Sequence, residues 1–372
     1  QAALLFDLSA AYDVLSHDLF LKKAEICGIA GIANNWLRSY LSGRSQVVQV
    51  GQGFSPQQYL DTGTPQGSSC SCLVFALFVG DLPLWTNDCL LEAYADDTFA
   101  TVGADNELEL RRRLEEEGSR ILTYFASNRL VANASKTAMI VFRQKTSPEP
   151  FKIELFGEEI HETPDEKLLG VHVQHDLKWT KQGEKVTSEV NYATSILRRL
   201  SDHLGRKELK TIADGLVMSK IRYCLPVFGG ESLRLQETDP QSVVMQKVQR
   251  SQNEMLRVIT RVRRRDHIRI KDLLESTNIM SVNQTTAYGL LMELWKAREF
   301  GVPVLEDLLE RRRDDERVLR SDSANKVCTI GSDKLAINCE RLWNLSRKKF
   351  RTTNLLKIAK IEAKNLAKTL PV

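Results

Sequence analysis

The sequence has no uninterrupted apolar run of the ~18–20 residues that a membrane-spanning helix needs, so no membrane partner is expected. It also shows no signal peptide or other targeting signal. Its seven cysteines are odd in number and lack paired spacing, which argues against a disulfide framework and predicts a reducing, intracellular compartment. Cys70 and Cys72 form a Cys-x-Cys pair with no second pair or histidine nearby, so we interpret them as small apolar core residues. No Cys/His zinc knuckle, internal repeat or low-complexity tract is found.

The charge is almost balanced overall but uneven along the chain. The 372 residues carry a formal net charge of +4, with 42% hydrophobic and 27% charged residues, as in an ordinary globular chain of two or three domains. Residues 241–265 hold seven basic residues against one acidic residue, and residues 341–372 hold nine against one. A polyanionic partner would suit both stretches, and two solvated helix faces are the alternative.

Two adjacent carboxylates, Asp96 and Asp97, stand between two short apolar runs within residues 90–101. Such runs are typical of β-strands, so the Asp pair is predicted to form the turn of a hairpin. Neighbouring carboxylates repel, but divalent cations such as Mg²⁺ prefer oxygen ligands and would remove that repulsion. The alternative is a solvated polar turn, because Asp is a common turn residue.

The first 150 residues predict a mixture of strands and helices. Residues 2–8 resemble a buried strand that ends near Asp7, and helices are expected near residues 15–27, 32–41, 73–79 and 105–129. A loop with two glycines and a proline, residues 62–69, precedes the third helix, and residues 138–142 form another strand. This order suits an antiparallel sheet with helices on one face. If the strands lie side by side, Asp7 meets Asp96 and Asp97, and three carboxylates can anchor two metal ions.

Beyond residue 150 the pattern changes from strands to helices. A hairpin is predicted around Gly157, and residues 167–173 are predicted to form a strand. Helices follow near residues 182–200, 207–221, 238–264, 268–276, 283–300, 303–312 and 341–368.

Five segments resemble the motifs of reverse transcriptases, in the order that the family shows them. Phe-Asp-Leu-Ser-Ala-Ala-Tyr-Asp at residues 6–13 is similar to motif A, and Gly-Thr-Pro-Gln-Gly-Ser at residues 63–68 is similar to motif B. Tyr-Ala-Asp-Asp at residues 94–97 resembles motif C, and residues 130–137 resemble motif D. Residues 167–171, with Leu-Lys-Trp at 177–179, resemble motif E of non-LTR, jockey-like retrotransposons. The resemblance covers about residues 1–230.

The resemblance implies an α+β fold with a palm-type antiparallel sheet, helices on one face, and a mostly α-helical thumb and C-terminal region. It implies four parts: the palm at residues 1–150, a primer-grip hairpin at 151–179, the thumb at 180–235 and a basic helical region at 236–372. The family's fingers precede motif A, so we expect an N-terminally truncated copy. Where the family shows Leu-Gly-Pro after motif B, this chain has Cys70, Ser71 and Cys72, which predicts a shifted helix start.

The resemblance also implies roles for single residues. Asp7, Asp96 and Asp97 would be catalytic and would bind two Mg²⁺ ions, with Mn²⁺ as a possible substitute. The residues implied in nucleotide binding are Leu8, Tyr12 beneath the sugar, Gln66 and Gly67, and the Leu8 carbonyl would add a ligand to the metal ions. Lys136 would also be catalytic, near the phosphates, as a point charge or a proton donor to the leaving pyrophosphate. Leu169 and Gly170 would belong to the primer grip. The alternatives are a core aromatic for Tyr12 and an exposed lysine for Lys136.

The function that the resemblance implies is RNA-directed DNA polymerisation: dNTPs are added to a primer 3′ end by two-metal phosphoryl transfer. The implied partners are an RNA template, a DNA primer or RNA–DNA hybrid, and dNTPs, and the family is expected in the nucleus and cytoplasm. One alternative is a non-catalytic, nucleic-acid-binding remnant of a retroelement. A weaker one is another palm-type polymerase, such as a group II intron maturase.

Overall fold

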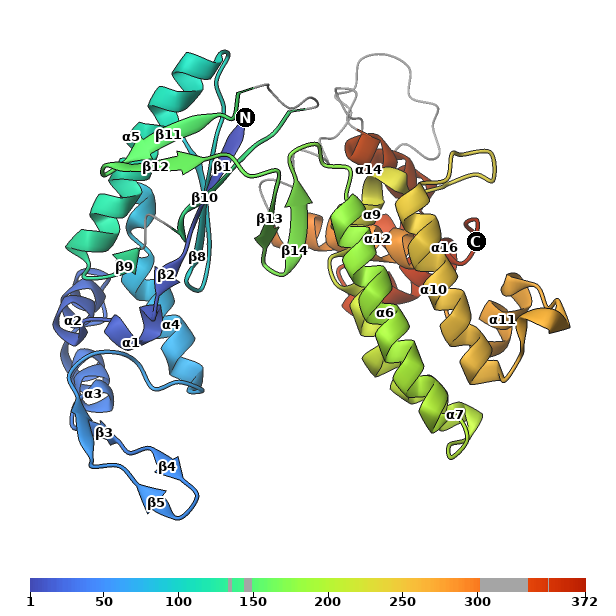
Figure 1. The fold of residues 1–372 in the computed structure, drawn as a ribbon, viewed down its shortest axis with the longest axis horizontal. Helices are drawn as coiled ribbons and strands as arrows, with labels where there is room; N and C mark the ends of the chain where they lie inside the picture. Colours follow the sequence, from blue (N-terminus) through green and yellow to red (C-terminus); the bar gives the residue numbers. More distant parts are fainter. Residues whose placement is uncertain (133–135, 144–148, 302–333, 347) are drawn as a thin grey trace. The chain divides into compact units, whose positions relative to one another are not determined.

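A computed structural model of the chain describes residues 1–132, 136–143, 149–301, 334–346 and 348–372 (Figure 1). These residues divide into two compact units, Gln1–Lys178 and Trp179–Val372. Small antiparallel sheets and helices make up the first unit, and the second is helical. Each unit is described by itself below. The predicted helix at 303–312 lies outside the described residues, as do residues 133–135 of the segment that resembles motif D.

A four-stranded antiparallel sheet organises the first unit. Its strand order is β10 (Ala138–Val141), β1 (Ala2–Phe6), β8 (Asp97–Val102) and β7 (Leu90–Tyr94). Central strand β1 alternates between buried and half-buried residues, with Ala2, Leu4 and Phe6 buried. Because side chains along a strand point to opposite faces in turn, this alternation packs one face of β1 into the core.

The helices of the first unit supply the rest of that core. They are α1 (Ala11–Val14), α2 (His17–Ile26), α3 (Gly31–Leu41), α4 (Ser69–Val79), the 3₁₀ turn η1 (Leu82–Trp85) and α5 (Glu107–Ser127). Helix α5 begins after Asn106, whose side chain accepts a hydrogen bond from Glu109 N at 2.8 Å and so caps the helix. Its buried face includes Phe125, which meets the Phe6 ring edge-on at 6.1 Å and joins the helix to β1.

Shorter strand pairs surround the main sheet. They are β2 (Leu8–Ser9) with β9 (Val131–Ala132), β3 (Arg44–Gln46) with β6 (Gln58–Leu60), β4 (Gln49–Val50) with β5 (Gly53–Phe54), β11 (Lys152–Leu155) with β12 (Glu158–His161), and β13 (Asp165–Leu168) with β14 (Val171–Gln174). Leu155 of β11 packs so closely on α5 that a Cβ at Gly118 would lie 2.9 Å from its methyl groups. The β11–β12 hairpin therefore shares the core of the first unit.

The helical unit has two hydrophobic clusters. Its elements are α6 (Thr180–Leu200), α7 (Arg206–Leu216), α8 (Met218–Arg222), α9 (Leu225–Gly229), η3 (Gly230–Ser232), α10 (Val243–Thr260), η4 (Arg264–Asp266), α11 (Ile270–Thr277), α12 (Val282–Phe300), α14 (Lys334–Leu345), α15 (Lys348–Thr352) and α16 (Leu356–Ala367). One cluster joins α6 to α10, and the other joins α12 to α14 and α16. Within the described residues, no helix combines the length and the apolar character needed to cross a bilayer.

Several sequence predictions of local structure were wrong. The hairpin turn consists of Ala95 and Asp96, not of the Asp pair, because Ala95 takes the left-handed conformation (φ 56°) and Asp97 already pairs with Tyr94 in the ladder. Residues 167–173 form the β13–β14 hairpin and not one strand. The predicted helices at 207–221 and 341–368 are broken into two and three helices.

The cysteines after motif B also differ from the predictions. Helix α4 begins at Ser69, capped by the Ser68 side chain, so Cys70, Ser71 and Cys72 lie in its first turn. Cys70 is only half-buried and Cys72 is exposed, so the prediction of core cysteines was wrong. Small side chains are compatible with either environment, and this explains why residue type alone did not decide between them.

Candidate active site

Strand pairing brings Asp7 and Asp97 together at one end of the main sheet. The β1–β8 ladder ends with the pair Phe6–Thr98, so Asp7, the residue after β1, lies next to Asp97, the first residue of β8. Asp96 occupies the turn next to them. Paired residues of an antiparallel ladder project to the same face, so this register gathers the carboxylates that the sequence singled out.

The charges at this hairpin tip influence one another. The pKa of Asp97 is raised, first by partial loss of hydration and then by the negative charges of Asp96 and Asp7. Asp7 is also paired with Lys136, whose Nζ lies 3.3 Å from Asp7 Oδ2, and both side chains are about half exposed. In the described part of the chain, no three His, Cys, Asp or Glu side chains converge closely enough to share a metal ion. The acids are neighbours, but they do not form a closed three-carboxylate cluster.

The loop that resembles motif B is fixed against the segment that follows Asp7. Gly63 N donates to Leu15 O at 2.8 Å, and Thr64 N donates to Tyr12 O at 2.8 Å. Gly63 has φ +83°, and a Cβ there would lie 2.7 Å from Asp13 O. His17 Nε2 lies 2.7 Å from Gly63 O. The glycine is therefore required both by its backbone conformation and by its contact with the neighbouring chain.

Gln66 and Gly67 lie on the exposed side of this loop. Gln66 Nε2 donates to Asp13 Oδ1 at 3.0 Å, so its amide is held by the segment that resembles motif A. Gly67 has φ +82° with open space around it, so backbone conformation alone calls for glycine there. The next residue, Ser68, caps α4 and accepts a 2.6 Å hydrogen bond from Tyr40 OH.

Tyr12 forms part of a pocket beside the hairpin. Its ring stacks on Phe75 with 4.7 Å between the ring centroids, and burial together with Cys72 and Asp96 raises the pKa of its hydroxyl. The pocket has a volume of about 420 Å³ and is lined by Tyr12, Cys72, Ala76, Val79, Gly80, Leu82, Pro83, Leu91, Ala93, Tyr94 and Ala95. Tyr12 is thus both a packed aromatic and a wall of the pocket next to the acidic tip.

Comparison with known proteins gives a family match that covers these residues. Residues 1–181 match the family model described as "Reverse transcriptase (RNA-dependent DNA polymerase)". This segment belongs to the reverse transcriptase family. The match includes the three carboxylates, the Tyr12 pocket and the loop around Gly63.

Curated relatives of this reverse transcriptase segment come from non-LTR transposons of Drosophila melanogaster. The probable RNA-directed DNA polymerase from transposon BS is 28% identical over 218 residues, which cover 56% of this chain and 24% of the relative. The RNA-directed DNA polymerase from mobile element jockey is 26% identical over 152 residues, which cover 39% and 16%. The chain thus spans about a quarter or less of the length of these relatives.

Solved structures show only a weak likeness. The telomerase of Candida albicans, in complex with a fragment of telomeric RNA, aligns over 75% of this chain and 50% of its own, with 14% identity and a TM-score of 0.34. The apo telomerase of Candida tropicalis aligns over 82% and 52%, with 12% identity and a TM-score of 0.37.

Leu169 and Gly170 form the two-residue turn of the β13–β14 hairpin in the reverse transcriptase segment. Both residues have positive φ, 46° and 84°. Two-residue hairpin loops favour this conformation because it matches the twist of the flanking strands. Glycine adopts it at little cost, whereas leucine rarely does, so Leu169 is a strained position on an exposed turn.

The sequence analysis missed a polar cluster behind the pocket. Lys23 Nζ donates to Asp81 Oδ1 at 2.7 Å and to Phe78 O at 2.8 Å, and Tyr124 OH donates to Asp81 Oδ1 at 2.5 Å. Burial by itself would raise the pKa of Asp81, but the hydrogen bonds from Lys23 and Tyr124 bring it below the ordinary value. This cluster ties α2 and α5 to the end of α4. Its members are 58 and 43 positions apart in the sequence, so no spacing pattern predicted the cluster.

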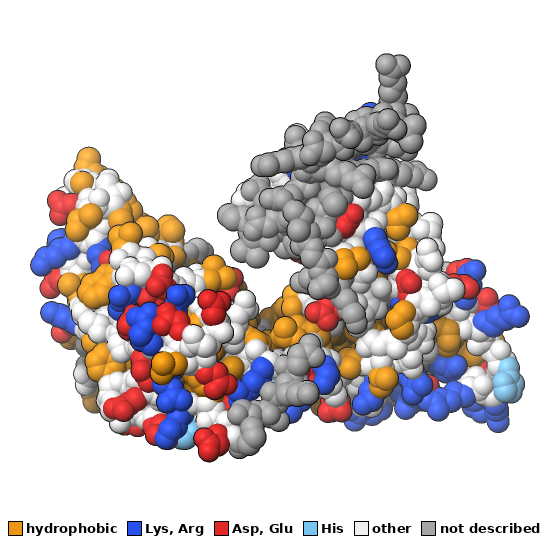
Figure 2. All heavy atoms as spheres, turned by 90° about the horizontal axis from the view of Figure 1, so that it is seen from above, with side chains coloured by type: hydrophobic (Ala, Val, Ile, Leu, Met, Phe, Trp, Pro, Cys, Tyr) orange, Lys and Arg blue, Asp and Glu red, His pale blue; other side chains and the backbone are white. Residues whose placement is uncertain are grey.

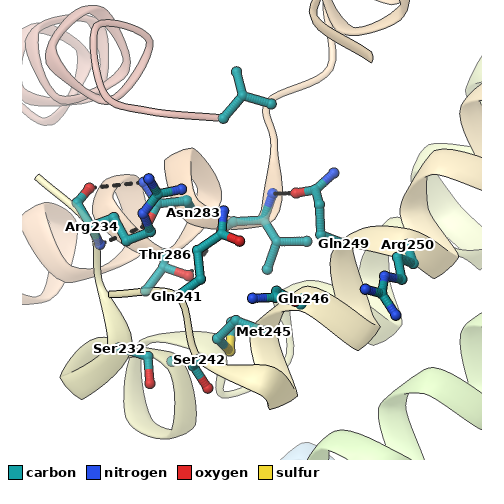
Figure 3. Close-up of a pocket in the computed structure, with 13 residues that line it drawn as sticks. Ser232, Arg234, Gln241, Ser242, Met245, Gln246, Gln249, Arg250, Asn283 and Thr286 are labelled. Atoms are coloured by element: carbon teal, nitrogen blue, oxygen red, sulfur yellow. Dashed lines mark hydrogen bonds between the residues drawn. The ribbon is translucent and has the colours of Figure 1, made fainter. Parts of the chain in front are cut away.

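The helical unit carries a basic groove and a polar pocket, neither of which was predicted in detail. The groove, about 540 Å³ in volume, is lined by Arg198, Arg257, Arg261, Arg263 and Arg264, with Asp202 and Glu254 as its acids. Figure 2 shows Lys and Arg side chains gathered along one edge of this unit. The pocket, about 220 Å³, lies between α10 and α12 (Figure 3). In this pocket the Gln249 side-chain oxygen accepts a 2.8 Å hydrogen bond from Val282 N, so the Gln249 amide connects α10 to the start of α12.

Proposed function

We propose that the chain contributes the polymerase centre of a non-LTR retrotransposon reverse transcriptase, an RNA-directed DNA polymerase that adds dNTPs to a primer 3′ end. The pairing of β1 with β8, which sets Asp7 next to Asp97 within the family segment, carries this proposal. Because the chain spans about a quarter or less of its relatives, the activity is proposed for the element's complete protein and tested in this chain.

The proposal assigns the palm to residues 1–150, with the sheet β10-β1-β8-β7 as its base. The β13–β14 hairpin, within residues 151–179, takes the part of the primer grip. Residues 180–235 form the thumb, and residues 236–372 form a basic region that is helical in the parts that the structure describes. The division of the chain after Lys178 supports a boundary between the hairpin and the thumb.

Asp7, Asp96 and Asp97 are the proposed ligands of two Mg²⁺ ions, which Mn²⁺ could replace. The donors fit such ions, because carboxylate oxygens are hard ligands. The pKa of Asp97 is raised first by partial burial and then by the negative charges of Asp96 and Asp7, and bound cations would offset that repulsion. When bound, the ions would supply charge stabilisation at the attacking and leaving oxygens. The pairing of Asp7 with Lys136 supports a place for Lys136 beside the phosphates, where its ammonium could donate a proton to pyrophosphate.

The remaining residues have proposed roles in positioning. Tyr12, held by Phe75, would lie beneath the sugar of the incoming nucleotide and exclude a 2′-hydroxyl by contact. Leu8, Gln66 and Gly67 would line the nucleotide, and the Leu8 carbonyl would add a ligand for the metal ions. Tight packing of Gly63 on Asp13 supports this arrangement, because it fixes the distance between the segments that resemble motif B and motif A.

The proposed macromolecular partners are an RNA template and a primer or RNA–DNA hybrid. The arginine-lined groove at the ends of α6 and α10 supports contact with a phosphate backbone in the helical unit. The Candida albicans telomerase that aligns weakly with the chain is itself bound to RNA.

Primer extension on an RNA template with dNTPs and Mg²⁺ tests the proposal. We expect synthesis by the chain, or by a longer product of the same reading frame, and its loss in Asp97→Asn. Asp105→Asn is the matched control, because Asp105 is an exposed acid of the same unit outside the site. Metal-dependent synthesis that survives Asp97→Asn would contradict the assignment.

A non-catalytic remnant that binds nucleic acid is a second candidate. It is favoured by one observation: no three metal-ligating side chains converge in the described residues. Salt-sensitive binding of RNA without synthesis, by both the chain and the longer product, would identify it.

A further inference from the structure

A projecting β-arm, residues 44–60, separates the segments that resemble motifs A and B. It consists of the β3–β6 pair at its base and the β4–β5 hairpin at its tip. Figure 1 shows it extending away from α3, and neither strand pair joins the four-stranded sheet. Every residue from 42 to 59 is exposed. Two-stranded ribbons are marginally stable alone, so an arm of this kind is suited to contact with another molecule.

Apolar and aromatic side chains cover the β-arm. Val50 is 78% exposed, Phe54 66% and Tyr59 71%. Exposed strands in monomeric proteins usually carry charges that prevent association, and the β-arm has only Arg44. A grouped set of exposed large apolar residues marks an interaction surface.

Charge and residue type indicate which kind of partner fits the β-arm. Residues 26–60 contain no Asp or Glu and carry two cations, Arg38 and Arg44. Among them are five glutamines, all in the β-arm: Gln46, Gln49, Gln52, Gln57 and Gln58. Exposed aromatic rings stack on unpaired bases, and a surface with Arg44 and no acid does not repel the phosphates of a single strand.

Flat side chains connect the β-arm to the candidate active site. Trp36 and Tyr40 stack with 5.6 Å between centroids and 10° between ring planes, and the Arg44 guanidinium lies 4.8 Å from the Tyr40 centroid. Tyr40 OH donates to Ser68 Oγ, and Ser68 caps α4 beside Gly67. The base of the β-arm is thus fixed to the loop assigned to the nucleotide.

We propose that the β-arm binds a single strand of nucleic acid, with Phe54 and Tyr59 stacking on unpaired bases and Arg44 contacting a phosphate. The inference rests on the proposed function in so far as that strand is the template approaching the polymerase centre. Duplexes are poor ligands for these rings, because their bases are stacked on one another. Binding at the β-arm needs neither metal ions nor dNTPs, so it can be measured separately from synthesis.

Fluorescence anisotropy of the full chain in EDTA, with oligouridine, oligothymidine and a blunt duplex as probes, tests the proposal. We expect the Phe54→Ala/Tyr59→Ala variant to bind single strands at least about tenfold more weakly, since each base–aromatic stack is worth roughly that factor. Ile26→Ala/Leu108→Ala is the matched control, because these apolar side chains are 86% and 81% exposed but lie outside the β-arm and outside the segments assigned to nucleic acid. Its affinity should stay within about twofold of the unmodified chain.

Salt dependence and probe choice sharpen the result. Arg44→Gln should lower the slope of log affinity against log salt concentration by about one, which corresponds to the loss of one phosphate contact. The aromatic variant should leave this slope unchanged. Equal losses with oligouridine and oligothymidine would assign the site to single strands in general, and a loss with oligouridine alone would assign it to RNA.

Unchanged single-strand affinity in the aromatic variant would overturn the proposal. So would a fall in molar mass by light scattering in that variant, because it would show that the β-arm holds a second copy of the chain. Failure of the proposed polymerase function is a different outcome: synthesis would be absent while single-strand binding remained sensitive to Phe54 and Tyr59.

Discussion

Replacement of Gly63 by alanine tests how tightly the two motif segments are joined. The new Cβ would lie 2.7 Å from Asp13 O and 2.9 Å from Asp13 Cα, which are backbone atoms that cannot rotate away. The loop would have to move, and the hydrogen bonds of Gly63 N to Leu15 O and of Thr64 N to Tyr12 O would be strained together.

Two costs add for Gly63→Ala. An L-residue in the left-handed conformation costs about 1–2 kcal/mol relative to glycine, and overpacking against fixed atoms costs about 1–3 kcal/mol more. Gly67 provides a matched comparison four residues away: its φ is +82°, but nothing lies within 4 Å of its Cβ position. Gly67→Ala should therefore show only the first cost.

Denaturant unfolding, followed by a probe in the first unit, gives the comparison. We expect Gly63→Ala to lower the free energy of unfolding by about 2–5 kcal/mol and Gly67→Ala by about 1–2 kcal/mol. Primer extension should fall with Gly63→Ala even where the protein remains folded, because the loop moves relative to Tyr12. Equal destabilisation by the two variants would refute the argument, since it would show that the contact with Asp13 carries no free energy.

Three further predictions concern charged groups. Lys23→Met should destabilise the first unit by about 1–3 kcal/mol, because Asp81 loses its cation. Since the folded pKa of Asp81 is lowered, the stability that Asp81 contributes is present above the ordinary pKa of 3.8 and is lost as the pH falls below it. Thermal unfolding measured from pH 7 to pH 3 should therefore show less acid sensitivity in the variant than in the unmodified chain. Asp97→Asn should raise thermal stability slightly at neutral pH, by well under about 1 kcal/mol for an exposed group, because a carboxylate with a raised pKa lowers the stability of the fold at pH values above that pKa. Mg²⁺ at ten times its Kd should stabilise the unmodified chain by about 1.4 kcal/mol in a melting assay. An equal shift in Asp97→Asn would contradict the proposed ligand role. Lys136→Met should change stability by less than about 1 kcal/mol, because the ion pair of Lys136 with Asp7 is half exposed, yet it should slow synthesis by about 100-fold or more. A loss of stability with unchanged synthesis would contradict the proposed role of Lys136 beside the phosphates.

The sequence predicted elements whose signals are local. The apolar run at residues 2–8 predicted a buried strand, which is β1, and the amphipathic pattern over residues 105–129 predicted the long helix α5. The run of motifs in family order predicted the reverse transcriptase segment, which the family match confirmed. These features depend on a few consecutive residues and on backbone preferences, so one sequence is enough to show them.

Features that depend on backbone conformation or on distant contacts were not predictable in this way. Ala95 and Leu169 take positive φ because the strand ladders on both sides leave only two residues for each turn. Neither alanine nor leucine favours positive φ, so the residue types do not predict this conformation. The Lys23–Asp81 pair joins residues 58 positions apart, and no spacing rule connects them. The roles of the acidic tip, of Tyr12 and of Lys136 stay predictions, because geometry places these groups but does not measure what they bind.

The register of β1 on β8 links the hydrophobic core to the proposed chemistry. A shift of one residue would move Leu4 and Phe6 from the core to the opposite face, because side chains along a strand alternate between faces. The same shift would separate Asp7 from Asp97. Burial of two apolar side chains therefore selects the register that brings two mutually repelling carboxylates together, and the free energy of the core offsets the cost of that repulsion.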